Sequence, residues 1–278
     1  GAHMARNLAR AGHDLVLWNR TGEKSAALAS ELDCHAVSTP RELAQTCRTV
    51  VTMLADDRGS EAVHMGADGL FAGGAARTII EMGTMSPDHI AFLSTGAPKD
   101  VQIIDAPVSG ATQAAEAAQL MIMAGCLHAN AEPVLPLFEA MGKQTIFLGK
   151  QGAGAVMKLA VNSLLHGINQ AFAESMTLAE AAGIKPADAL DVIEASAACA
   201  PMLKYRRPLY LDEAANQVTF TVALARKDMA VAAALADRLG VSMPQSTVTL
   251  ANLIEAEKAG YAERVMASML PFMRARRP

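Results

Sequence analysis

Cysteine is scarce in this chain, and so are long apolar runs and clustered positive charge. The four cysteines lie far apart and form no C-x-x-C pair, so neither a zinc site nor a disulfide framework is predicted for Cys34, Cys47, Cys126 and Cys199. No apolar run reaches the ~18 residues that a membrane-spanning helix needs, and no charged-then-apolar leader indicates secretion. The net charge is −4 with scattered lysines and arginines, so no basic face predicts nucleic-acid binding. These absences predict a cytoplasmic protein with reduced thiols.

Hydrolytic and metal motifs are also missing. The sequence contains no G-x-S-x-G motif and no clustered pair of carboxylates, and its histidines lack the spacing of metal ligands. What it does contain is 278 residues, of which 51% are hydrophobic and 19% charged. A chain of this length is long enough for two domains and a substantial core.

The first half of the chain alternates short apolar runs with helical stretches. The pattern predicts strands near residues 15–19, 35–37, 49–54, 77–82, 101–105, 120–124 and 145–148. Between them it predicts helices near residues 4–11, 21–31, 40–47, 59–65, 87–97 and 131–141. Strands that alternate with helices at this spacing form βαβ units, so we expect an α/β fold, with a Rossmann-type doubly wound sheet over residues 1–151.

The second half contains helical patterns only. Residues 155–182 are expected to form one long helix that Gly183 ends, and further helices are expected at 187–196, 221–239, 245–259 and 263–275. This pattern predicts an all-helical domain over residues 152–278, joined to the first domain by the long helix. Because that helix is apolar nearly all round, we expect it to pack against another subunit, in a homodimer or homotetramer.

Only the end of a dinucleotide-binding fingerprint is present at the start of the chain. The full motif is a strand followed by G-x-G-x-x-G at the start of a helix. Gly1 stands three residues before Met4, where the last glycine would be, and the strand and the first two glycines are absent from the sequence. The letters Gly-Ala-His-Met are also what a cleaved expression tag would leave, and the sequence leaves both readings open. If those glycines are absent from the molecule itself, a bound pyrophosphate would lose backbone donors, and cofactor affinity should then be severely weakened.

The second expected strand ends in Asn19, Arg20 and Thr21. Sites that prefer NAD place an acidic residue here to accept a hydrogen bond from the ribose 2′-hydroxyl. A neutral asparagine followed by an arginine suits the 2′-phosphate of NADP instead, because a guanidinium binds phosphate through paired charge-assisted hydrogen bonds. A solvated surface arginine is the alternative. In this strand-to-helix context the pattern favours NADP, with NAD as the other candidate.

Polar turns follow three further strands on the side where ligands bind. Met53 and Leu54 end one strand, and Thr84 follows the next in a Gly-Thr-Met-Ser-Pro turn, where Ser86 is better explained as a helix cap. The third turn contains Ser109, Gly110 and Ala111, whose hydroxyl and backbone N–H groups could cradle a carboxylate.

Lys158 and Asn162 are the strongest catalytic candidates. They lie four residues apart in the long apolar helix and therefore on one face of it. A desolvated lysine can exchange a proton near neutral pH, and an amide can hold a carbonyl or hydroxyl in register with it. The alternative for Lys158 is a packed stem with a solvated ammonium group. Lys227 has a local ion pair with Asp228 as its simplest explanation, and His166 is expected to pack.

Taken together, these segments resemble the β-hydroxyacid dehydrogenase family, which includes 3-hydroxyisobutyrate dehydrogenases and glyoxylate and succinic semialdehyde reductases. The resemblance spans residues 1–273 and is carried by GAHMARNLARAGHDLVLWNRT, EMGTMSP, DAPVSG, GAGAVMKLAVN and ALARKD. It implies a Rossmann domain and a helical domain that dimerises. It also implies a catalytic lysine at Lys158 with its partner at Asn162, a carboxylate-binding turn at Ser109 and Gly110, and cofactor contacts from Thr84 and Lys227.

The chain departs from the family pattern at three small residues. Ala111, Ala118 and Cys126 stand where glycines are usual, and the methyl group of Ala111 could alter the preference for substrate size. The expected function is an NADP-preferring oxidoreductase that acts on a small 3-hydroxy acid, a short semialdehyde or glyoxylate, with Lys158 as the general acid and base. The alternatives are an imine reductase, which usually lacks this lysine, and a cofactor-binding dimer without turnover.

Overall fold

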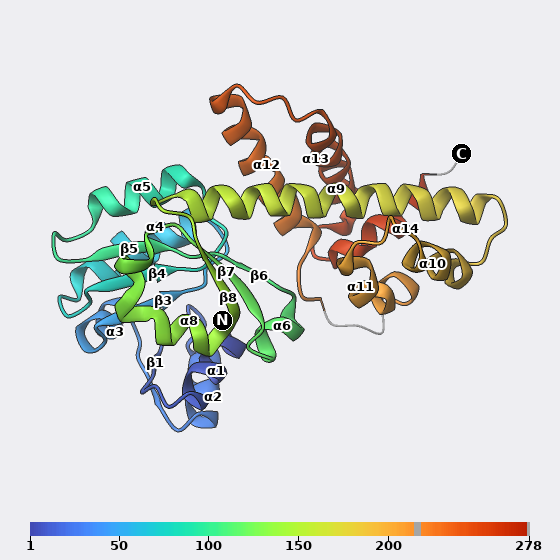
Figure 1. Ribbon diagram of the computed structural model, residues 1–278. Helices are drawn as coiled ribbons and strands as arrows, with labels where there is room; N and C mark the ends of the chain where they lie inside the picture. Colours follow the sequence, from blue (N-terminus) through green and yellow to red (C-terminus); the bar gives the residue numbers. More distant parts are fainter. Residues whose placement is uncertain (214–217, 277–278) are drawn as a thin grey trace. The chain divides into compact units, whose positions relative to one another are not determined.

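The computed structural model describes residues 1–213 and 218–276 (Figure 1). The chain divides into two compact units, Gly1–Lys158 and Leu159–Pro278. The first unit contains all the strands of the described residues, and the second is helical. No helix within the described ranges is long and apolar enough to cross a membrane.

The strands of the N-terminal unit form three hydrogen-bonded sheets. In the first, β1 pairs in parallel with β2. In the second, β4 lies between β3 and β5 and pairs in parallel with both. In the third, β7 pairs antiparallel with β6 and parallel with β8. Their bounds are β1 (Val16–Leu17), β2 (His35–Ala36), β3 (Thr49–Thr52), β4 (Thr78–Glu81), β5 (Gln102–Asp105), β6 (Val108–Ser109), β7 (Leu120–Ala124) and β8 (Gly142–Phe147).

Helices connect these strands. They are α1 (Ala2–Arg10), α2 (Gly22–Glu31), α3 (Pro40–Thr46), α4 (Asp57–Met65), α5 (Pro87–Gly96), α6 (Thr112–Glu116), α7 (His128–Ala131) and α8 (Leu135–Met141), with 3-10 turns η1 (Leu70–Ala72) and η2 (Glu132–Val134). Side-chain caps explain several of the starts. Thr39, Asp56 and Ser86 accept hydrogen bonds from backbone N–H groups three residues later. The expected cap at Ser86 is therefore confirmed.

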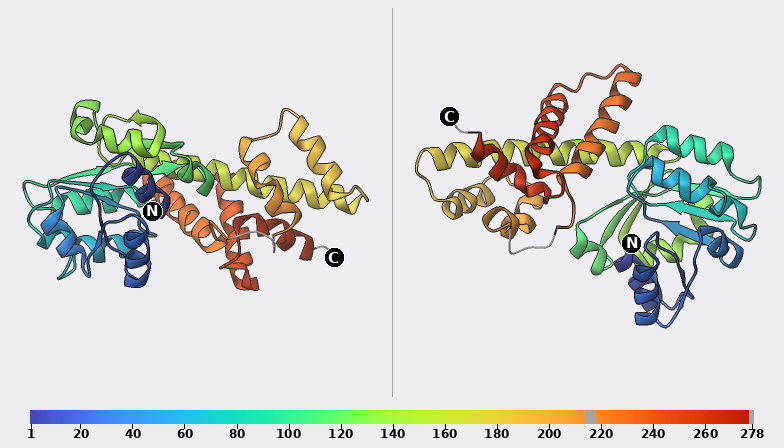
Figure 2. Two further views of the ribbon diagram at one scale, coloured as in Figure 1. Left: turned by 90° about the horizontal axis from the view of Figure 1, so that it is seen from below. Right: turned by 180° about the vertical axis from the view of Figure 1, so that it is seen from behind.

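Strands β4 and β5 bury both of their faces. Ile79 and Ile103 pack into one apolar cluster with Ala44 of α3, while Ile80 and Ile104 pack into another with Phe138 of α8. Alternate residues of a strand point to opposite faces, so the sheet must be covered by helices on both sides. The expected Rossmann-type α/β unit is confirmed, and Figure 2 shows its helices and strands from two further sides.

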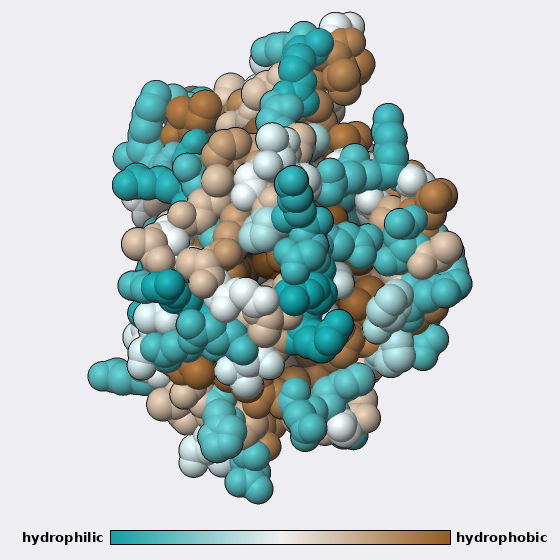
Figure 3. All heavy atoms as spheres, turned by 90° about the vertical axis from the view of Figure 1, so that its left-hand side faces the viewer, coloured by the Kyte–Doolittle hydropathy of each residue, from teal (hydrophilic) through white to brown (hydrophobic). Residues whose placement is uncertain are grey.

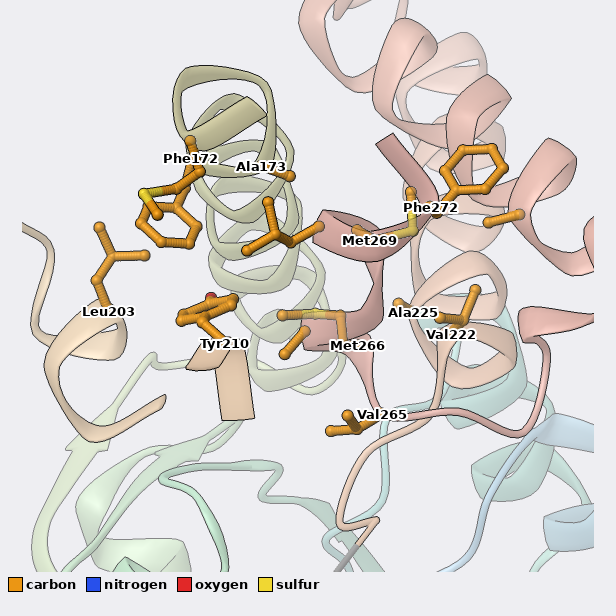
Figure 4. Packing of buried hydrophobic residues seen from close by; sticks show 14 of the residues in the cluster. Phe172, Ala173, Leu203, Tyr210, Val222, Ala225, Val265, Met266, Met269 and Phe272 are labelled. Carbon is orange, nitrogen blue, oxygen red and sulfur yellow. The ribbon is translucent and has the colours of Figure 1, made fainter. Parts of the chain in front are cut away.

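The C-terminal unit is built from α9 (Ala153–Ala181), from Leu159 onward, and the helices after it. These are α10 (Pro186–Ala195), α11 (Pro201–Leu211), α12 (Val222–Leu239), α13 (Pro244–Ala256), the π-helical η3 (Glu257–Tyr261), the 3-10 turn η4 (Met266–Ser268) and α14 (Met269–Ala275). One apolar cluster holds them together. In Figure 4, Phe172 of α9 lies beside Tyr210 of α11, with ring centroids 4.4 Å apart, and Met266 lies nearby. The expected all-helical second half is confirmed.

Several elements differ from the sequence expectation, among them the unexpected short helix α6 and the late start of α14 at Met269. Val108–Ser109, expected as part of a turn, forms strand β6, because these residues pair with Ile122 and Met121 of β7. The helix Pro201–Leu211 was not expected, since Pro201 and Pro208 interrupt a helical pattern; Pro201 in fact starts the helix.

On the face shown in Figure 3, hydrophilic residues are interspersed with smaller hydrophobic areas.

Candidate functional site

The carboxyl ends of β3, β4 and β5 finish in a row of three polar residues. Thr52, Glu81 and Asp105 pair in register across the three strands, and all three are buried. Ligands of doubly wound sheets bind beyond this edge. The segments that follow these three residues therefore define the candidate site of the N-terminal unit.

The expected cofactor-binding residues Gly1, Met53, Leu54 and Thr84 meet at this edge. A Cβ atom placed on Gly1 would lie 3.6 Å from the Cβ of Met53. A Cβ on Gly83, next to Thr84, would lie 2.5 Å from the carbonyl oxygen of Leu54, so only glycine lets the turn after β4 come this close. The structure thus places Gly1 beside Met53, and the turn that carries Thr84 beside Leu54.

Helix α1 begins here and has unused backbone donors at its start. Gly1 is its N-cap, no side chain caps it, and its first turn holds no acidic residue. The N–H groups of a helix start attract phosphate, through hydrogen bonds and through the helix dipole. This end of α1 therefore fits the pyrophosphate of a dinucleotide.

Asn19, Arg20 and Thr21 form the link from β1 to α2, and all three are exposed. The Oδ1 atom of Asn19 accepts a hydrogen bond from the N–H of Thr21 at 2.8 Å, which closes a tight turn. The side chain of Asn19 is therefore engaged locally, and the exposed guanidinium of Arg20 is the cationic group of this turn. That arrangement leaves the guanidinium accessible to an anionic group.

Glu81 holds the turn that carries Thr84. Its Oε1 atom accepts the N–H of Gly83 at 3.1 Å, and its Oε2 atom accepts the hydroxyl of Ser60 at 2.9 Å. Burial raises the pKa of Glu81 and lowers the pKa of His64, whose Nε2 atom lies 4.0 Å from Oε2 of Glu81. Burial thus favours the uncharged form of both groups. Through its hydrogen bonds with Gly83 and Ser60, Glu81 holds the turn that carries Thr84 in place.

The segment after β5 places Ser109 on β6, opposite Met121. Gly110 has φ of 139°, and a Cβ there would lie 2.8 Å from the Cβ of Ala114. Only glycine therefore fits between Ser109 and Ala111, the N-cap of the short helix α6. The three residues expected to bind a carboxylate are held by strand pairing on one side and by this tight turn on the other.

Asp105 connects the sheet to the helix that carries Lys158. Its Oδ1 atom accepts the N–H of Gly152 at 2.8 Å, and its Oδ2 atom accepts the N–H of Ala155 at 3.0 Å. Burial raises the pKa of this carboxyl to about 6, while the backbone hydrogen bonds act in the opposite direction. The carboxyl of Asp105 therefore caps the start of α9, three to six residues before Lys158.

Asn162 and Lys227 belong to the C-terminal unit and share one partner there. The amide nitrogen of Asn162 donates to Oδ2 of Asp228 at 2.6 Å, and the ammonium of Lys227 lies 2.7 Å from Oδ1 of Asp228. Asp228 is thus more than the local partner of Lys227, because it also fixes the amide of Asn162. The expectation missed this role, since Asp228 lies 66 residues from Asn162 in the sequence. His166 packs as expected, stacked on Phe220 with ring centroids 5.7 Å apart.

Two sequence families match the chain. The NAD-binding domain of 6-phosphogluconate dehydrogenase matches residues 1–149, and the family described as NAD-binding of NADP-dependent 3-hydroxyisobutyrate dehydrogenase matches residues 152–273. Glyoxylate/succinic semialdehyde reductase 1 of Arabidopsis thaliana is 31% identical over 248 residues, which cover 88% of this chain and 84% of that protein. Both units of the chain are therefore similar to parts of known dehydrogenases.

Solved structures show the same similarity. The 3-hydroxyisobutyrate dehydrogenase of Mycobacterium tuberculosis, solved with L-serine, has a TM-score of 0.83 at 25% identity and covers 98% of this chain and 95% of its own. An imine reductase from Pseudomonas sp. has a TM-score of 0.62 at 19% identity and covers 98% and 95%, a likeness that shows the fold alone.

The two matching families and the reductase relative assign the chain to the NAD(P)-dependent dehydrogenases and reductases that act on CH–OH groups. The chain belongs to the β-hydroxyacid dehydrogenase family, in which glyoxylate/succinic semialdehyde reductases and 3-hydroxyisobutyrate dehydrogenases are found. The resemblance inferred from the five sequence segments is confirmed.

Proposed function

We propose that this protein is an NADP-preferring oxidoreductase that interconverts a small 3-hydroxy acid, or the alcohol of a short semialdehyde or of glyoxylate, with its carbonyl form. The exposed Arg20 after β1, where an acidic residue would favour NAD, supports the preference for NADP. The names of the relatives and the description of the second matching family support the substrate class. Lys158, held on a helix that starts at the carboxyl edge of the sheet, is the observation that carries the proposal.

In the proposed reaction a bound NADP(H) would supply the chemistry of hydride transfer at the substrate carbon. Lys158 donates a proton to the carbonyl oxygen during reduction and takes it back during oxidation. Asn162 lies one turn further along α9 and orients the same oxygen, while Asp228 fixes its amide. Ser109, with the turn that follows it, binds the substrate carboxylate.

Cofactor contacts complete the assignment. We propose that Gly1 and the start of α1 face the pyrophosphate, that Asn19, Arg20 and Thr21 face the 2′-phosphate, and that Met53, Leu54, Thr84 and Lys227 line the nicotinamide half. We propose a cofactor-binding domain of residues 1–151 and a helical domain of residues 152–278. We also propose that the protein acts in the cytoplasm. An imine reductase or a cofactor-binding dimer without turnover is the alternative, and the lysine at position 158 favours the dehydrogenase.

A self-associating surface is proposed on α9. Ala160, Leu164, Ala171 and Leu178 are exposed and recur at intervals that bring them to one face of the helix. Leu164 and Leu178 expose 67% and 74% of their surface. A homodimer or homotetramer would cover this stripe. A mass near 29.1 kDa in light scattering, the mass of one chain, would contradict the proposal.

The test of the proposed function is NADPH oxidation with glyoxylate, succinic semialdehyde and other short aldehydes and keto acids. Lys158→Ala should lower kcat/KM at least about 100-fold, since positioned proton donors contribute about 10²–10⁴-fold. NADPH should still raise the melting temperature of the variant. Lys143→Ala, at an exposed lysine of β8, serves as the matched control and should keep its activity. Undiminished turnover by Lys158→Ala would refute the role of the lysine.

A further inference from the structure

The helix that carries Lys158 starts without a cap of its own. Gly152, which precedes the first residue of α9, has no side chain and adopts φ of 82°. The N–H groups of a first helical turn need partners from outside the helix when they are buried. The N–H groups of Gly152 and Ala155 both donate to the carboxyl group of Asp105 at the end of β5, at 2.8 Å and 3.0 Å.

The surroundings of this carboxyl group admit no larger side chains. A Cβ on Gly125 would overlap both oxygens of Asp105, and a Cβ on Gly154 would lie 2.9 Å from Oδ2. Asp105 is 0% exposed. The carbonyl of Asp105 accepts the N–H of Gly125 at 2.8 Å, and Gln151 donates from its side chain to the carbonyl of Ile103 at 3.0 Å. The start of α9 is therefore docked on β5 through a closely fitted contact.

Asp105 also lies at the start of the segment that carries Ser109. Ser109 lies four positions after Asp105 along the chain, and Lys158 lies three positions after Ala155 along α9. The carboxyl group thus fixes the proposed proton donor relative to the proposed carboxylate-binding turn. A first turn that frayed or shifted would move the base of the Lys158 side chain, and displacements of about 1 Å can reduce the rate of a reaction about 100-fold.

We propose that Asp105 is a positioning residue for catalysis, whose carboxylate caps α9 and holds Lys158 in register with Ser109. The proposal rests on the proposed function, because it assigns to Asp105 the placement of the general acid. Asp105 itself lies beneath the site and exchanges no proton with the substrate. Its effect is on turnover, and cofactor binding at the start of α1 is left intact.

Asp105→Asn tests this role with a side chain of nearly the same shape. The amide oxygen can accept only one of the two N–H groups, and the amide nitrogen then faces the other. We expect kcat to fall at least 10-fold while the dissociation constant of NADPH changes by less than twofold. Amide hydrogen exchange at residues 152–158 should accelerate at least 10-fold. Thr39→Ala, which removes the cap of α3 at the N–H of Glu42, is the matched control and should change neither kcat nor exchange in α9.

The outcomes separate this proposal from the proposed function. Unchanged hydrogen exchange at the start of α9 in Asp105→Asn would overturn the capping role, whatever the activity of the variant. Accelerated exchange with unchanged kcat would overturn the positioning role while Lys158→Ala, if inactive, still supports the proposed function. Full activity of Lys158→Ala would overturn the proposed function and the placement of Lys158 by Asp105 with it. Asp105→Ala repeats the test without any acceptor and should lose at least as much turnover as Asp105→Asn.

Discussion

Replacing Asp105 by asparagine removes a buried ionisable group, so the stability of the variant relative to the natural chain should depend on pH. Burial raises the pKa of Asp105 from 3.8 to about 6, although the N–H groups of Gly152 and Ala155 lower it. The folded chain therefore binds this proton more tightly than the unfolded chain. The resulting stabilisation is fully present below pH 3.8 and is lost as the pH rises through about 6.

The magnitude follows from the size of the shift. A rise of about two pKa units, at about 1.4 kcal/mol per unit, corresponds to about 3 kcal/mol of stability lost by the natural chain between acid and neutral pH. The asparagine variant does not titrate, and its lost hydrogen bond costs about 1–3 kcal/mol at every pH. The stability of the variant minus that of the natural chain should therefore rise by about 3 kcal/mol from about pH 4 to about pH 7.5.

Urea unfolding followed by tryptophan fluorescence measures this difference. Trp18 is the single tryptophan of the chain and lies in the same unit as Asp105, where its indole N–H donates to the carbonyl of Ser38 at 3.2 Å. Asp14→Asn, at an exposed aspartate, controls for the change of residue type. A difference that stays constant within about 0.5 kcal/mol across the pH range would refute the raised pKa. A difference that falls with pH would show that the backbone hydrogen bonds outweigh burial.

Two further predictions concern the cofactor and the backbone. Arg20→Ala should weaken NADPH binding at least about 10-fold, because it removes a charge-assisted contact of about 1.5–3 kcal/mol. NADH binding should be unchanged. Equal effects on both cofactors in a binding titration would contradict the assignment of Arg20 to the 2′-phosphate. Ala118 adopts φ of 55°, so Ala118→Gly should stabilise the N-terminal unit by about 1 kcal/mol in urea unfolding. Ala117→Gly, at φ of −81°, is the matched control and should destabilise the unit. If both variants were more stable, relief of backbone strain at Ala118 would not explain the effect.

Local patterns predicted most of the fold. The long apolar run after Gly152 predicted α9, and Gly183, with φ of 87°, ends it as expected. Strand β6 was missed because it depends on pairing with residues more than ten positions later in β7, and nothing inside Val108–Ser109 records that pairing. Helix α11 was missed because helical propensity falls at Pro201 and Pro208, whereas tertiary packing of Leu203 and Tyr210 decides its conformation.

The residues of the candidate site were also only partly predictable from the sequence. Lys158 and Asn162 could be paired from the sequence because they lie four residues apart in one helix. The residues that orient them could not be identified, since Asp228 reaches Asn162 across 66 residues and Asp105 reaches Gly152 across 47. Periodicity describes neighbours along one element, and hydrogen bonds between distant elements leave no periodic trace. The supporting acids were therefore recognised only from the folded chain.

The close fit around Asp105 also limits how this protein can change over generations. A methyl group at Gly125 would meet the carboxyl group of Asp105 first, so this glycine becomes replaceable only after the aspartate has become smaller. A methyl group at Gly154 would still overlap the carbonyl oxygen of Met123, whatever residue stands at position 105. A smaller residue at position 105 leaves the first turn of α9 uncapped, so it brings its own loss. Single substitutions at positions 105 and 125 should therefore each be harmful, whereas their combination should be milder than the sum of the two effects. Positions 105 and 125 are expected to change together, while Gly154 is required independently by the carbonyl oxygens of Met123 and Asp105.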